Sequence, residues 1–150
     1  MSPNPTTLGA VEKQLKAPIG DDSLIDNLFF SYRKLSETFV AQNPVALLQN
    51  AGLFVEASLR VIEHLIFKNH IPLKGKLNVD VVVAKLENAA GPEGLRIHAG
   101  RLTRVIYDFR TRKKAVHLKA VDPEAIDASL LFNIATWIMI EILKESGISD

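Results

Sequence analysis

Apolar side chains recur every three or four residues along most of the chain, which is the repeat of an amphipathic helix. The first clear segment follows Asp21 and Asp22, which supply an N-cap and negative charge at a helix start. Its apolar positions with helical spacing are Leu24, Leu28, Leu35 and Phe39. A helix from Asp22 to about Ala41 is therefore predicted.

A second, longer helix is predicted to begin at Asn43-Pro44, because asparagine is a favoured N-cap and proline fits the first helical position. One face of this helix carries Leu48, Gly52, Val55, Leu59, Ile62 and Ile66. The helix is expected to end near Asn69, since the residue before Pro72 avoids helical backbone angles. Residues 74–76, with the sequence Lys-Gly-Lys, are predicted to form a loop.

Residues 78–90 carry two conflicting patterns. Four valines between positions 79 and 83 favour a strand, whereas Asn78 as an N-cap and the helix-forming residues 84–88 favour a helix. The sequence contains no second strand candidate that could pair with this one. A helix is therefore the preferred interpretation.

Two further helices are predicted in the second half of the chain. The first covers about residues 95–112, after the helix-breaking segment 91–94, and its inward positions are Leu95, Leu102, Ile106 and Phe109. The second begins at Asp122-Pro123-Glu124 and runs to about Glu145. Its main apolar stripe comprises Ile126, Leu130, Ile134, Trp137 and Ile138, and Leu131, Phe132 and Met139 widen that stripe nearly all round. This last helix is therefore expected to be buried against both the core and another subunit.

These elements predict an all-α fold, a bundle of four or five helices whose last helix is long and apolar. The length of 150 residues is typical of one domain. Residues 1–20 contain three prolines and two glycines and lack the basic and apolar regions of a signal peptide. We therefore expect a flexible N-terminal tail at residues 1–20 and one helical domain at residues 21–150.

Composition narrows the possible chemistry. The chain has no cysteine, which excludes disulfides and thiolate metal sites and permits a reducing cytoplasm. His64 and His70 lie near Glu63, but their spacing fits no standard zinc pattern. They are interpreted as part of a solvated helix end, and no metal and no cofactor are expected. The apolar stretch 128–143 is short and interrupted by polar residues, so no membrane association is expected and a cytoplasmic location is predicted.

The net charge of +1 gives no global indication of nucleic-acid binding, so any such indication must come from local clusters of basic residues. The densest cluster lies at the end of the predicted helix 95–112 and comprises Arg110, Thr111, Arg112, Lys113, Lys114 and His117. Four cations and a histidine in eight residues indicate an anion site, and phosphate is the obvious anion. Basic residues at a helix C-terminus also stabilise the helix dipole, and that ordinary role explains many such runs.

Helical geometry favours one pair within this cluster. Arg110 and His117 lie seven residues apart, so they would share a face if the helix continued. Arg112 would diverge from His117, although a kink at the helix end would also allow Arg112 to contribute, and both arginines remain candidates. A histidine can move protons at neutral pH, while an arginine can hold a phosphate oxygen with two hydrogen bonds. This combination suits cleavage of RNA without a metal.

The segment from Tyr107 to His117, the Val121-Asp122-Pro123 helix start, Asp127-Ala128 and Trp137 together resemble the C-terminal half of HEPN-superfamily proteins. The similarity is greatest to the bacterial branch related to abortive-infection proteins, and it covers about residues 50–143. The resemblance implies a bundle of about five helices, frequent dimerisation and metal-independent endoribonuclease activity. Arg110 would be the motif arginine and His117 the motif histidine. Glu56 and Arg60 would face each other on the family's N-terminal helix.

The expected function is thus an endoribonuclease, with a toxin or a phage-defence effector as its candidate roles. Arg110 and His117 would be catalytic, and Thr111, Arg112, Lys113 and Lys114 would support them by binding phosphate. The expected partners are RNA, a second copy of the chain across a shared cleft, and an antitoxin or defence-system protein. The alternative is a non-catalytic HEPN-like module that binds RNA or protein, or serves in assembly, through the same basic cluster.

Overall fold

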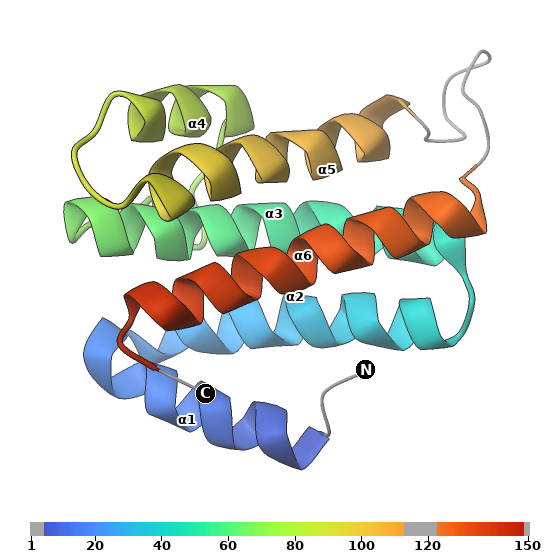
Figure 1. Ribbon diagram of the computed structural model, residues 1–150, viewed down its shortest axis with the longest axis horizontal. Coiled ribbons are helices and arrows are strands. Elements are labelled where there is room, and N and C mark those ends of the chain that lie inside the picture. The colour runs from blue at the N-terminus through green and yellow to red at the C-terminus, as the bar shows by residue number, and fades with distance from the viewer. Residues whose placement is uncertain (1–4, 113–122, 149–150) are drawn as a thin grey trace.

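The structure is a computed structural model that describes residues 5–112 and 123–148 (Figure 1). Every regular element in these residues is helical. The elements are α1 (Pro5–Ile19), α2 (Asp22–Val40), α3 (Pro44–Phe67), α4 (Val79–Glu87), the π-helical turn η1 (Gly94–Ala99), α5 (Gly100–Arg112) and α6 (Ala125–Glu145). The predicted all-α bundle is confirmed, with six α-helices in the described residues where four or five were expected.

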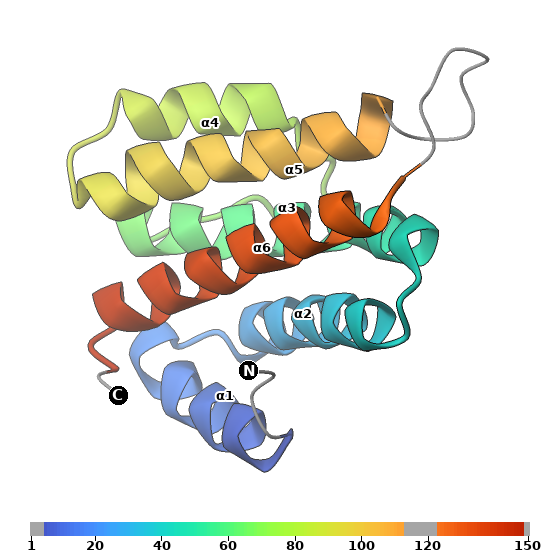
Figure 2. The same ribbon diagram turned by 45° about the vertical axis from the view of Figure 1, so that its right-hand side comes forward.

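Helix α3 lies at the centre of the bundle and contacts α2, α4, α5 and α6. In Figures 1 and 2, α2 lies on one side of α3, α4 and α5 lie on the other, and α6 runs across α3 between them. This central position explains why α3 is apolar on nearly every side, with thirteen buried residues. Among these are Arg60 and Glu63, whose charges need partners inside the fold.

Three helices begin at the N-caps that the sequence predicted. The carboxylate of Asp21 accepts the backbone N–H of Leu24 at 3.1 Å at the start of α2. The side-chain oxygen of Asn43 accepts from Ala46 at 3.1 Å at the start of α3, and that of Asn78 accepts from Val81 at 3.2 Å. The ambiguous segment 78–90 is therefore helical at Val79–Glu87, as preferred, because its cap and its packing outweigh the strand preference of its valines.

The N-terminal segment differs from the flexible tail predicted for residues 1–20, because residues 5–19 form α1. Leu15 and Ile19 are buried against the rest of the bundle. Ion pairs of 2.7 Å between Lys16 and Asp26, and of 2.6 Å between Glu12 and Arg33, join α1 to α2. The prediction treated the prolines as helix breakers, whereas Pro5 is the first residue of α1, where proline is tolerated, and Pro18 lies in its last turn.

Two boundaries near the basic cluster also differ from the prediction. The helix predicted at 95–112 is divided into η1 and α5. No residue separates them, because η1 ends at Ala99 and α5 begins at Gly100. Helix α6 has Glu124 as its N-cap, and the backbone N–H of Glu124 donates to Asp127 at 2.9 Å. The predicted start at Asp122 lies outside the described residues.

Helices α3 and α6 are both long and apolar enough to cross a membrane by length and composition alone. The apolar window is 67% buried within the fold for α3 and 50% buried for α6. Burial of this extent is typical of core helices, which pass the same test, so the finding is weak evidence for membrane insertion. The cytoplasmic location therefore stays a prediction.

Candidate functional site

The candidate site lies at one end of the bundle, where three parts of the chain meet. The last turn of α5, the connection between α2 and α3, and the first turn of α6 all lie at this end in both views (Figures 1 and 2). Arg110 and Thr111 belong to the last turn of α5, and Arg112 is its final residue. The start of the basic cluster therefore lies at the same end of the bundle as the α2–α3 connection and the start of α6.

Arg110 folds back against the backbone of α3 at Gly52. A Cβ atom added at Gly52 would lie 2.6 Å from Nε of Arg110, 2.7 Å from Cζ and 2.9 Å from Cδ. The Nε atom is buried and has no hydrogen-bond partner among the described residues. A guanidinium is always charged, so this geometry presents a positive donor that the described part of the chain does not satisfy.

Thr111 has a local role that the sequence did not reveal. Its hydroxyl lies 3.1 Å from the carbonyl oxygen of Tyr107 and 3.1 Å from that of Asp108, to which it donates. The single hydroxyl proton is therefore used within α5, and only the oxygen lone pairs remain available to a ligand. In this arrangement Thr111 cannot donate to a phosphate.

The other predicted site residues fall largely outside the described residues. Lys113, Lys114 and His117 are not described, and the side chain of Arg112 is not described either. The convergence of Arg110 and His117 thus stays a prediction, as does the choice between Arg110 and Arg112.

An open pocket of about 620 Å³ lies at the same end of the bundle, between the α2–α3 connection and the start of α6. Its wall combines apolar and small polar side chains, namely Thr38, Phe39, Val40, Gln42, Asn43, Pro44, Ala125, Ala128 and Ser129. A mostly apolar cleft with a few polar groups is the usual form of a small-ligand site. The sequence alone gave no signal for this pocket, because its walls come from residues far apart in the chain.

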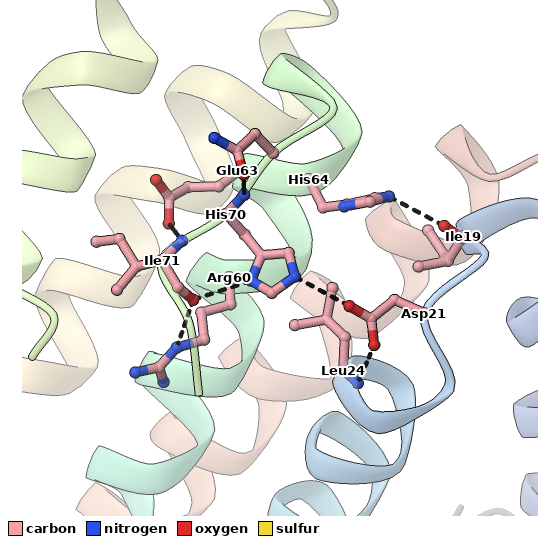
Figure 3. A network of polar contacts seen from close by, with 9 residues as sticks. Ile19, Asp21, Leu24, Arg60, Glu63, His64, His70 and Ile71 are labelled. Atoms are coloured by element: carbon pink, nitrogen blue, oxygen red, sulfur yellow. Dashed lines mark hydrogen bonds and ion pairs between the residues drawn. The ribbon is translucent and has the colours of Figure 1, made fainter. Parts of the chain in front are cut away.

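The pair predicted between Glu56 and Arg60 is present, with 3.8 Å between the carboxylate and the guanidinium. The stronger contacts of Arg60 are to backbone carbonyls, because its Nε donates to Ile71 at 3.2 Å and Nη2 donates to Gly75 at 2.9 Å. Figure 3 shows the first of these bonds. Arg60 thereby fastens the connection between α3 and α4, and its role is structural.

His64 and His70 were interpreted as a solvated helix end, and both instead contact the α1–α2 junction. Nε2 of His64 lies 3.0 Å from the carbonyl oxygen of Ile19, and Nε2 of His70 lies 3.1 Å from the carboxylate of Asp21 (Figure 3). No group of three or more histidine, aspartate or glutamate side chains suited to a metal occurs in the described residues. The two histidines therefore join helices.

Helix α6 leaves part of its apolar surface uncovered. Ile126, Leu130, Trp137 and Ile140 have exposed fractions of 72%, 45%, 38% and 54%. These positions are separated by four, seven and three residues, which places them on one side of the helix, and we call them the α6 stripe. The opposite side of α6 packs in the core through Leu131, Ala135, Ile138 and Ile142.

The fold defines the chain as an all-α helical bundle. Comparison of the chain with protein-family models, with curated proteins and with solved structures gives no match. The likeness to HEPN proteins therefore depends on the motif residues themselves.

Proposed function

We propose that this protein is a metal-independent endoribonuclease of the HEPN type. The observation that carries the proposal is the state of Arg110, whose guanidinium lies on the backbone of α3 with Nε buried and unpaired within residues 5–112 and 123–148. Leaving a charged donor unsatisfied is unfavourable. Because Nε is buried against α3, an anion would meet this guanidinium at its Nη nitrogens. Phosphate is the anion that a guanidinium binds with two parallel hydrogen bonds.

In this proposal the ribose 2′-hydroxyl attacks the adjacent phosphorus, and the bond from phosphorus to the 5′-oxygen breaks. A base removes the 2′-hydroxyl proton, an acid supplies a proton to the 5′-oxygen, and the products are a 2′,3′-cyclic phosphate and a 5′-hydroxyl. Arg110 holds a non-bridging oxygen and stabilises the charge of the pentacoordinate phosphorus. His117 serves as one of the two proton carriers, and Arg112, Lys113 and Lys114 bind neighbouring phosphates.

A second copy of the chain would supply the second proton carrier. One histidine can hold only one of the two protons in motion, and a two-fold dimer brings its counterpart to the same cleft. The α6 stripe supports this arrangement, because it is an apolar surface that the described residues of one chain leave exposed. Such an enzyme fits a toxin or phage-defence effector held in check by a partner protein.

The alternative proposal is a non-catalytic module that binds RNA or protein. The hydrogen bonds of Thr111 favour it, because its hydroxyl proton is committed to the carbonyl oxygens of Tyr107 and Asp108. The site then has one fewer polar donor to assist a reaction. The cations of the cluster would still hold a phosphate backbone.

Cleavage of labelled single-stranded RNA in the presence of EDTA tests the proposal. The parent protein should produce 2′,3′-cyclic phosphate ends, and both Arg110→Ala and His117→Ala should lower the rate at least about a hundredfold. Arg101→Ala is the matched control, since Arg101 lies on the same helix and pairs with Glu87 at 2.8 Å. RNA that stays intact but binds in a salt-sensitive manner identifies the binding module, and an active His117→Ala variant refutes the proposed chemistry.

A further inference from the structure

Gly52 lies in the interior of α3, eight residues after its first residue. Glycine in a helix interior destabilises the helix relative to alanine, so its presence there needs a reason. Gly52 does not adopt a positive φ, so its backbone conformation does not require a glycine. The reason must lie in what packs against it.

The packing partner is the site arginine. The Nε, Cζ and Cδ atoms of Arg110 all lie within 3.0 Å of the place that a Cβ at Gly52 would occupy. These atoms form the rigid, planar part of the side chain, so a Cβ would displace the guanidinium as a unit. Gly100, at the start of α5, provides a contrast because the nearest atom to an added Cβ is 3.8 Å away, on Leu86.

The α3 side chains beside Gly52 offer no partner to the buried Nε of Arg110. The neighbouring α3 residues Leu48, Ala51 and Val55 are buried and apolar, so they offer no hydrogen-bond acceptor from their side chains. Glu56, one turn further along α3, has its carboxylate 3.8 Å from Arg60. That carboxylate is thus paired with a different guanidinium.

We infer that Gly52 is the positioning residue for Arg110: the bare α3 backbone at residue 52 is the surface against which the guanidinium is held to receive a phosphate. This inference rests on the proposed function, since it assigns Gly52 to the same site. It joins a residue of α3 to the last turn of α5 in one site. Substitution of Gly52 should therefore change the affinity for RNA only through its effect on Arg110.

The test compares Gly52→Ala, Arg110→Ala, the double variant and the control Gly100→Ala. The first measurement is the urea midpoint of unfolding. In the Arg110→Ala background the space over residue 52 is free, so Gly52→Ala should raise the midpoint, reflecting a roughly fivefold smaller unfolding equilibrium constant. With Arg110 present, the same substitution should leave the midpoint unchanged or lower it. Gly100→Ala should raise it in both backgrounds.

The second measurement is the affinity for a fluorescent oligoribonucleotide in which 2′-deoxy residues prevent cleavage. Gly52→Ala and Arg110→Ala should each weaken binding about tenfold or more, which corresponds to the loss of one charge-assisted hydrogen bond. The double variant should bind no more weakly than either single variant, because both substitutions remove the same contact. Gly100→Ala should bind as the parent does.

Three results would overturn the inference, and a fourth would refute the proposed function on which it rests. An equal rise of the midpoint in both backgrounds would show that Arg110 does not need the glycine. Losses of affinity that add in the double variant, or a Gly52→Ala protein that binds normally, would show that Gly52 does not act through Arg110. A parent protein that fails to bind the oligonucleotide refutes the proposed function itself, and that failure is seen without any Gly52 variant.

Discussion

Nε2 of His70 lies 3.1 Å from Oδ2 of Asp21, and Nδ1 of the same ring lies 2.9 Å from the carbonyl oxygen of Ile71 (Figure 3). A carboxylate and a carbonyl oxygen only accept hydrogen bonds, so the His70 ring is the donor in whichever of these contacts is a hydrogen bond. Because Oδ1 of Asp21 also caps α2 through Leu24, one carboxylate joins the start of α2 to the chain that leaves α3.

We predict that Asp21→Asn destabilises the fold in a pH-dependent way. The backbone N–H of Leu24 and then the imidazole of His70 lower the pKa of Asp21 below its usual value of 3.8. A carboxylate with a lowered pKa stabilises the folded state above its unfolded pKa, and this contribution is lost as the pH falls through the folded pKa. The free energy of unfolding of the variant should therefore be smaller than that of the parent at pH 6, and the two should converge as the pH falls through the folded pKa of Asp21. Urea unfolding from pH 2.5 to pH 7 measures the difference.

Two companion variants separate the parts played by Asp21. Asp21→Ala also removes the N-cap, which asparagine would retain, so it should be less stable than Asp21→Asn by about 1 kcal/mol. Asp22→Asn removes a charge at the same helix end without affecting the contact to His70, and its loss should be a few tenths of a kcal/mol. An equal loss in Asp22→Asn would attribute the effect to the helix dipole and contradict the prediction.

The N-caps Asp21, Asn43 and Asn78 were predictable because a cap depends on a few consecutive residues. The contact between His70 and Asp21 was not, because it depends on how the α1–α2 junction packs against the end of α3. Sequence spacing gave only the proximity of His64 and His70 to Glu63 and thus suggested a solvated helix end. Local chemistry can be read from the chain, whereas pairs between distant segments require the tertiary fold.

The candidate site likewise combines a residue that the sequence identified with a contact that only the fold reveals. Arg110 was recognised from the density of charge around it and from its distance to His117 along the chain. Gly52 was read as one more position on the inward face of a helix, and that reading was correct as far as burial goes. Its relation to Arg110 arises only when α5 packs on α3. The helical period predicts which face is buried but not which side chain will cover it.

We predict that Arg60→Met destabilises the fold by about 2–4 kcal/mol. Arg60 is almost fully buried and donates to the carbonyl oxygens of Ile71 and Gly75. Methionine retains much of the volume but leaves both acceptors without this donor. Arg33→Met is the control, because Arg33 is 40% exposed and exposed ion pairs contribute less than about 1 kcal/mol. Chemical denaturation of both variants measures the difference, and equal losses would show that burial of Arg60 has no special effect.

We predict that Gln42→Gly stabilises the fold by roughly 0.5–1 kcal/mol. Gln42 has a φ of 55°, and its N–H donates to Phe39 at 3.0 Å while the N–H of Asn43 donates to Thr38 at 3.0 Å. These two bonds form a Schellman motif, whose left-handed position favours glycine. Ala41→Gly is the matched control, since its φ of −72° suits any residue and glycine there should destabilise. Thermal unfolding measures both variants, and a lower midpoint for Gln42→Gly than for Ala41→Gly would contradict this account.

The α6 stripe leads to a prediction about oligomeric state. If the stripe forms the interface that the proposed nuclease needs, the parent protein should be a dimer at micromolar concentration, measured by light scattering after size exclusion. Leu130→Glu and Trp137→Glu each place a charge where the partner's apolar surface would lie, and each should weaken association at least about tenfold. Trp137 is the only tryptophan of the chain, so its fluorescence emission should shift to longer wavelength when the dimer dissociates.

A control variant distinguishes loss of the interface from a general effect of surface charge. Val81 on α4 is 62% exposed and lies away from α6, so Val81→Glu should remain a dimer. The monomeric α6 variants should also lose RNA cleavage while keeping their far-ultraviolet circular dichroism, because a composite site needs the second proton carrier. A parent protein that is monomeric at 100 micromolar would reject the dimer. Cleavage that persists in a monomeric Leu130→Glu variant would instead show that one chain contains both proton carriers.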